Sequence, residues 1–180
     1  KAILDPLSTR EAAEAVVSCS DGRLGGTITP QHLLANRNHM LVGGIKPHFY
    51  CLPILKSEED RLALLEAIGS GCPRLFLGTD SAPHAVGRKE SACGCAGVYS
   101  ALTALELYAT AFEEAGIMQH FEAFASRNGA DFYGLSPATG TVTLRREEMR
   151  VPDRVPFGDE MVVPFRAGSV LNWRLIADAR

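Results

Sequence analysis

Three short apolar or β-branched runs, at residues 2–4, 27–29 and 74–77, each lead into a segment of helical character. This alternation constrains the fold of the 180-residue chain more than any other feature, because strands that alternate with helices are typical of parallel βα units. The sequence therefore predicts an α/β fold with three such units. Three units do not close a sheet, and a complete eight-stranded barrel takes about 250 residues.

Local signals place the helices. Two capping-box patterns, at residues 8–11 and 57–60, precede apolar residues at helical spacing. Two later helices are predicted over residues 101–115 and 118–126, the second of them ended by Asn128 and the glycine after it.

A small β region is predicted after Gly134, where the pattern changes from helical spacing to alternation. Residues 160–165 and 169–175 have the composition of two strands, with Arg-Ala-Gly between them. We expect these two segments to form a β-hairpin.

Composition excludes several classes of protein. Hydrophobic residues make up 46% of the chain and charged residues 22%, which is typical of a globular protein. A net charge of −3 gives no electrostatic reason to expect nucleic acid or a membrane as a partner. Five cysteines, an odd number, do not suggest a secreted disulfide framework, so we expect a cytoplasmic protein. The first residue is Lys1 rather than Met and lies in a predicted strand, so we expect the natural chain to extend upstream.

Asp80 is the strongest candidate for a site residue. It follows the predicted strand at residues 74–77, and the carboxyl ends of strands form the active face of parallel α/β folds. His84 follows four residues later and can bind a metal or an anionic substrate. A carboxylate in this place can also accept backbone N–H groups as a turn cap. The residues alone leave these roles open, since no H-x-H motif, phosphate loop or nucleophile elbow specifies a reaction.

Two loops accompany this pair. Residues 36–56 lack periodicity, and an irregular stretch of about twenty residues in a compact domain is usually functional when ordered. The loop at residues 88–97 begins with Arg88 and Lys89, which we interpret as solvated charges. It also contains a C-x-C motif, whose spacing does not match a structural zinc site.

Seven sequence blocks occur along the chain in a specific order and spacing. They are GTITPQHLL (26–34), NRNHMLVGGIKPHFYCLPILK (36–56), FLGTDSAPH (76–84), RKESACGCAG (88–97), TAFEEAG (110–116), QHFEAF (119–124) and FYGL (132–135). Together they resemble the class II dihydroorotases of the amidohydrolase superfamily, from near residue 3 almost to the C-terminus.

The resemblance implies the C-terminal part of a (β/α)8 barrel. Residues 1–135 then supply the last three βα units and the terminal helices, and residues 136–180 form a small β extension packed on the barrel. The implied activity is the zinc-dependent, reversible cyclisation of N-carbamoyl-L-aspartate to L-dihydroorotate in de novo pyrimidine biosynthesis, in a possible homodimer. Family members hold two zinc ions, and most of the family's zinc ligands lie upstream of this chain.

Four positions match residues of the family site. Asp80 matches an aspartate that binds zinc and also takes and returns the reaction proton. Leu52 matches a residue whose backbone contacts the dihydroorotate ring. His84 matches the histidine that holds the substrate carboxylate, and Ala96 matches a backbone contact to the same end of the substrate. The resemblance implies that the loop containing Ala96 anchors an acid group and that its two basic residues make the surroundings electropositive.

One departure from the family pattern lies near the first residue. The family's sixth strand ends in Leu-Glu-His, whose histidine binds the second zinc, whereas this chain reads Leu4-Asp5-Pro6, and Pro6 has no donor atom for a metal. This keeps open two alternatives: a non-catalytic dihydroorotase-like scaffold or partner subunit, and another cyclic amidohydrolase with a different ring substrate. The isolated chain, with one family zinc ligand and open strand edges, is expected to be inactive.

Overall fold

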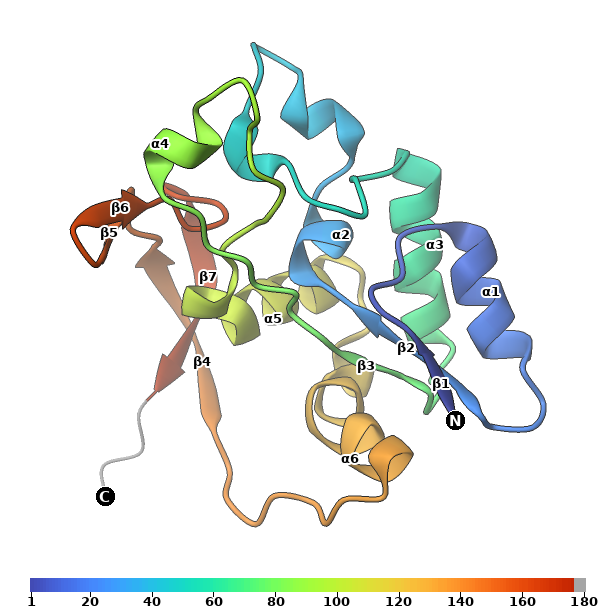
Figure 1. Cartoon of the computed structure of the whole chain (residues 1–180). Helices are drawn as coiled ribbons and strands as arrows, with labels where there is room; N and C mark the ends of the chain where they lie inside the picture. Colours follow the sequence, from blue (N-terminus) through green and yellow to red (C-terminus); the bar gives the residue numbers. More distant parts are fainter. Residues whose placement is uncertain (177–180) are drawn as a thin grey trace.

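Three parallel strands form the sheet that the sequence predicts, in the order β1 (Ala2–Leu4), β2 (Leu24–Ile28) and β3 (Leu75–Leu77) (Figure 1). The structure is a computed structural model and describes residues 1–176. Because all the pairings are parallel, the carboxyl ends of the three strands lie at the same edge of the sheet. Within the described residues both β1 and β3 have an unpaired edge.

Helices α1 (Arg10–Ser18), α2 (Pro30–Leu34) and α3 (Glu58–Gly69) follow the first two strands. The capping box before α3 is confirmed, since Ser57 and Asp60 exchange side-chain and backbone hydrogen bonds. The cap of α1 is displaced by one residue from the prediction, because the hydroxyl of Thr9, not that of Ser8, accepts the backbone N–H of Ala12.

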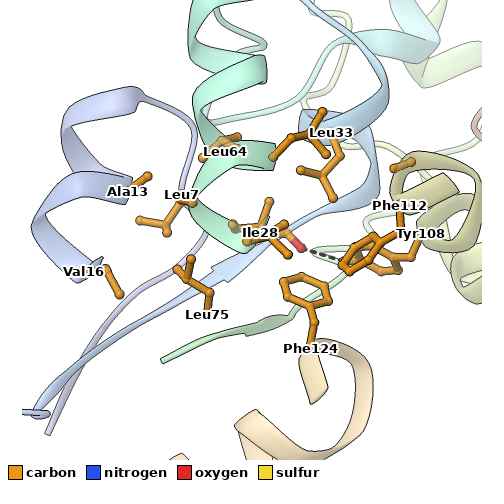
Figure 2. Close-up of a cluster of buried hydrophobic side chains, with 14 residues drawn as sticks. Leu7, Ala13, Val16, Ile28, Leu33, Leu64, Leu75, Tyr108, Phe112 and Phe124 are labelled. Carbon is orange, nitrogen blue, oxygen red and sulfur yellow. Dashed lines mark hydrogen bonds between the residues drawn. The ribbon is translucent and has the colours of Figure 1, made fainter. Parts of the chain in front are cut away.

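The core lies where the sheet meets these helices. Ile28 from β2 packs with Val16 from α1, Leu64 from α3 and Tyr108 from a later helix, and Figure 2 shows these side chains turned toward one another. Burying an aliphatic side chain of this size contributes about 2 kcal/mol. Gly26 allows the close approach of Leu7, since a Cβ at this glycine would lie 2.5 Å from the Leu7 side chain.

The helical region after the third strand is longer than predicted. Helix α5 (Ala104–Glu114) ends before Gly116 as expected, but the chain then runs through short helical turns into α6 (Asn128–Tyr133). The prediction that a helix ends at Asn128 is therefore wrong. The side-chain amide of Asn128 donates to the carbonyl oxygen of Leu75 at 2.9 Å, so the residue ties this helix to β3 instead of ending it.

The β region pairs differently from the prediction. The long strands are β4 (Thr143–Arg150) and β7 (Val170–Ile176), which pair with each other, while β5 (Val155–Phe157) pairs with β6 (Glu160–Val162). The predicted hairpin between residues 160–165 and 169–175 is therefore wrong. Strand β7 instead returns to β4 and packs against α5, where the carboxylate of Glu106 accepts the backbone N–H of Leu175 at 3.1 Å.

The short helices α2, α4 (Val86–Lys89) and α6 have only four to six residues each. Among residues 1–176 no helix combines the length and the apolar character that crossing a bilayer requires.

Candidate functional site

Two carboxylates follow strands of the sheet at its carboxyl edge. Asp5 comes directly after β1, and Asp80 comes three residues after the end of β3. The hydroxyl of Thr27, on the strand between them, donates to the Asp5 carboxylate. Parallel topology therefore brings together two acidic residues that are 75 positions apart in the sequence.

The backbone at Asp80 is unusual. Its φ of 42° lies in the left-handed region, which aspartate tolerates better than most residues because its short side chain can bond locally. The preceding residue is held from two sides, since the Thr79 carbonyl accepts hydrogen bonds from the Gln31 amide at 3.4 Å and from the Ser100 hydroxyl at 3.3 Å. Non-glycine residues in this conformation cluster at functional sites, where the surrounding structure holds them in place.

Electrostatics also link Asp80 to its neighbours. Partial burial, followed by the negative charge of Asp5, raises the pKa of the Asp80 carboxyl. Burial, followed by the charge of Asp80, raises the pKa of the Cys51 thiol to about 11, so that Cys51 is a neutral thiol at pH 7. Asp80 thus lies within electrostatic reach of Asp5 on one side and of the residue before Leu52 on the other.

The segment after Asp80 folds back on itself and brings His84 to Ala96. Ala82 donates its backbone N–H to the carbonyl of Val98 at 3.0 Å, which closes the base of the loop. The Nε2 atom of His84 lies 3.1 Å from the carbonyl oxygen of Ala96. Because a carbonyl only accepts, Nε2 carries a proton in this arrangement. The two residues to which the resemblance assigns the substrate acid group are therefore in direct contact.

Leu52 lies in the irregular loop at residues 36–56, where its side chain is 62% exposed. That loop is joined to the Ala96 loop, because Gly97 donates its backbone N–H to the carbonyl of Tyr50 at 2.9 Å. Nearer the surface, His48 pairs with Glu90 at 3.0 Å and joins the same two loops. The structure thus gathers all four residues singled out from the sequence around the carboxyl edge of the sheet.

The interpretation of Lys89 as a solvated charge is wrong. Its side chain is only 2% exposed, and its ammonium donates to the backbone carbonyls of Tyr50, Cys95 and Gly97. Arg88, beside it, is exposed as expected. Nothing in the local sequence separates these two basic residues, since the three acceptors come from loops that only the tertiary fold brings together.

Asp5 was also missed as a partner of Asp80, although a signal for it was present. Asp5 follows a predicted strand directly, and Asp80 follows one by three residues, so the rule that selected Asp80 selects Asp5 as well.

The donor set fits part of a zinc site. Carboxylate oxygens are among the ligands that zinc takes, usually in sets of three or four protein groups. In residues 1–176 no group of three or more His, Cys, Asp or Glu side chains is arranged to hold a metal. Asp80 and Asp5 can therefore supply at most part of a coordination shell, and Pro6 supplies none.

Comparison with known sequences gives a consistent result, although no family model matches the chain. The chain is 58% identical over 175 residues to a dihydroorotase of Marinobacter nauticus and 61% identical over 175 residues to a dihydroorotase of Halorhodospira halophila. Each match covers 97% of this chain and about half of the relative, so the chain spans about half the length of the curated relatives it matches.

Solved structures of similar shape come from the same class of enzyme. The crystal structure of dihydroorotase from Saccharomyces cerevisiae in complex with 5-fluoroorotic acid superposes with a TM-score of 0.87 at 29% identity, over 99% of this chain and 52% of that one. The dihydroorotase of Campylobacter jejuni gives a TM-score of 0.83 at 31% identity, over 96% and 49%. An L-hydantoinase from Arthrobacter aurescens, at 18% identity and a TM-score of 0.75, shares the fold.

The chain is therefore similar in fold to dihydroorotases and to a hydantoinase, over about half of the length of each. In sequence the chain is homologous to dihydroorotases over nearly its whole length.

Proposed function

We propose that this chain is the C-terminal part of a dihydroorotase that interconverts N-carbamoyl-L-aspartate and L-dihydroorotate in de novo pyrimidine biosynthesis. One observation carries the proposal: identity of 55–61% to dihydroorotases over at least 97% of the chain. The grouping of Asp80, Leu52, His84 and Ala96 at one edge of the sheet supports it.

In this proposal β1, β2 and β3 are the last three strands of the barrel. The unpaired edges of β1 and β3 are the places where the upstream strands add, since a strand edge exposes unpaired N–H and C=O groups. Residues 1–135 form the barrel part, and residues 136–180 form a β extension whose strand β7 packs on α5.

We assign each site residue a role in the reaction. In the hydrolytic direction the oxygen of a water bonds to the ring carbonyl carbon, the adjacent C–N bond breaks, and the ring nitrogen leaves as the amino group of the ureido product. Asp80 accepts the proton of the attacking water and delivers it to the leaving nitrogen, so the carboxylate is regenerated. Cyclisation is the reverse sequence of the same steps.

The substrate is held from the loop side. His84 and the backbone at Ala96 bind its carboxylate, and the backbone at Leu52 contacts its ring. The contact between His84 and Ala96 supports this assignment because it places the two residues side by side, so that the backbone N–H of Ala96 lies near the histidine for an acid group to reach. The dihydroorotase of Saccharomyces cerevisiae was crystallised with 5-fluoroorotic acid, which is also a pyrimidine ring that bears an acid group.

Zinc is the proposed cofactor. Asp80 is the ligand that this chain contributes, and the remaining ligands come from the upstream part of the protein. When bound, zinc lowers the pKa of water and polarises the ring carbonyl. Pro6, in the place of a family ligand, reduces the number of protein groups available to a second zinc.

The test is turnover by the full-length protein that contains this chain, purified with zinc. We expect L-dihydroorotate to be consumed and formed, as followed by its ultraviolet absorbance, while hydantoin and dihydrouracil are turned over far more slowly. Efficient turnover of hydantoin with none of dihydroorotate would replace the proposal by the hydantoinase alternative. The separate chain of residues 1–180 is expected to be inactive, because Asp80 then lacks its partner ligands.

A non-catalytic scaffold or partner subunit is the second candidate, and Pro6 is the observation that favours it. A properly metallated full-length protein without turnover of any of these substrates would establish this candidate instead. We further propose a cytoplasmic protein that forms a homodimer, which sedimentation of the full-length protein tests.

A further inference from the structure

The ammonium of Lys89 lies at the centre of three backbone carbonyls. Its Nζ atom donates to Tyr50 O at 2.9 Å, to Cys95 O at 2.6 Å and to Gly97 O at 2.8 Å. A lysine ammonium has three N–H donors and no acceptor, so these bonds use its full capacity. All three hydrogen-bond partners of the ammonium are uncharged backbone carbonyls.

The three carbonyls flank both proposed substrate contacts. Cys95 and Gly97 are the residues on either side of Ala96, and Tyr50 lies two residues before Leu52. The backbone bond from Gly97 to Tyr50 runs beside the ammonium and joins the same segments. Lys89 thus fixes the two backbone segments that meet the substrate, while its own charged group is turned away from solvent.

We propose that Lys89 is a positioning residue for substrate binding, which acts by holding the backbone at Ala96 and Leu52 in the geometry that binds the acid group and ring of the substrate. This inference rests on the proposed function. Lys89 is not a catalytic residue, since all three of its donors are already used by the loops.

A buried ammonium is suited to this role for a physical reason. Burial is unfavourable for the charged form and lowers the pKa of the Lys89 ammonium. An apolar side chain of the same length avoids that cost but leaves carbonyl groups without a donor, and a buried acceptor without a partner is itself destabilising. Support matters in this loop because Cys95 has a positive φ of 23°, a conformation that residues other than glycine rarely adopt.

A competing explanation is that Lys89 acts on the substrate through its charge alone. Arginine at this position separates the two explanations. It keeps the positive charge, but its donors lie in a planar fork that cannot converge on three carbonyls around one point. Positioning predicts that Lys89→Arg impairs binding, whereas a charge effect predicts that it binds normally.

The experiment measures steady-state kinetics with L-dihydroorotate in the full-length zinc enzyme and in its Lys89→Met, Lys89→Arg and Lys46→Met variants. Lys46 is exposed in the irregular loop at residues 36–56, so its replacement removes one positive charge near the site without removing buried contacts. We expect both Lys89 variants to raise KM about tenfold or more and to change kcat less than about threefold, while the Lys46 variant retains the wild-type KM. Circular dichroism and the Tm report the fold of each variant.

The outcomes separate this inference from the proposed function. A wild-type enzyme without turnover contradicts the proposed function and, with it, this inference. Normal turnover with a wild-type KM in folded Lys89→Met or Lys89→Arg overturns the inference alone. A lower Tm with an unchanged KM, or failure of both Lys89 variants to fold, would make Lys89 a structural residue and would also overturn it.

Discussion

The two sides of the candidate site differ in how complete they are. On the strand side, Asp5 and Asp80 are exposed carboxylates, and partial burial and then the charge of Asp5 raise the pKa of the Asp80 carboxyl. No third metal-ligating group joins them in residues 1–176. On the loop side, buried Lys89 has every donor bonded, and His84 has its partner at Ala96.

This difference indicates what each side depends on. The loops are held by hydrogen bonds within the chain and are formed in this structure. Two neighbouring carboxylates with few compensating groups are unfavourable unless a cation or further donors lie beside them. In the proposed function, the further groups on the strand side come from the part of the enzyme that corresponds to the relatives' other half. The predictions below test the division, beginning with the largest effect.

Asp80→Asn tests the strand side. Asparagine also tolerates the left-handed conformation, so the replacement removes the charge with little change in backbone strain. We expect kcat of the full-length enzyme to fall about a thousandfold, because a proton acceptor is lost. The matched control is Asp159→Asn in an exposed turn, which should leave kcat unchanged. Equal activity of the Asp80 variant and the wild type would remove Asp80 from the reaction.

The pH dependence of the free energy of unfolding, through His32, tests the loop side. Burial is the main cause that lowers the pKa of His32 to about 4 from its ordinary 6.5, and its Nε2 atom bonds the carbonyl of Pro53 at 3.0 Å, next to Leu52. The unfolded chain therefore binds a proton at higher pH than the folded chain does. The folded state therefore has its full free energy of unfolding above pH 6.5. As the pH falls from 6.5 through 4, the depressed pKa of His32 lowers this free energy by about 3 kcal/mol.

Urea unfolding of the full-length protein and of His32→Gln, at a series of pH values between 7 and 4, measures this contribution. The wild type should lose more free energy of unfolding over that window than the variant. Parallel curves for the two proteins would show that His32 is protonated equally in the folded and unfolded states, and would contradict the prediction.

Gly97→Ala tests how closely the loops fit. A Cβ at this position would lie 2.5 Å from the carbonyl oxygen of Ala82 and 2.8 Å from the His84 ring, and the backbone φ is positive. We expect the free energy of unfolding to fall by about 2 kcal/mol and KM to rise, because both the loop and His84 must shift.

The matched control for this prediction is Gly87→Ala, where nothing lies within 4 Å of the added Cβ. It should be neutral, or stabilising by about 0.5 kcal/mol, because alanine restricts the unfolded chain more than glycine does. Equal stability of the two alanine variants would show that the loop around Gly97 can shift without lowering the free energy of unfolding.

The sequence was most informative where the signals were local. The capping box of Ser57 and Asp60 predicted the start of α3, and the short apolar runs predicted the three strands. The position of Asp80 after the third strand could be predicted, because it depends only on the strand before it and on the rule that parallel strands share an edge. The dihydroorotase resemblance likewise rested on contiguous blocks, and close sequence similarity confirms it.

The tertiary structure decided everything that depends on distant partners. Strand β7 pairs with β4 rather than with its neighbour in sequence, and Asn128 bonds β3 where a helix end was predicted, because strand pairing and side-chain bonding depend on which surfaces meet in three dimensions. Arg88 and Lys89 are adjacent and chemically alike, yet one is exposed and the other is buried among three carbonyls. The sequence by itself placed Asp80 and His84 after the third strand. Only the folded chain determined which residues are held together, because hydrogen bonds form between groups that are close in space whatever their separation along the chain.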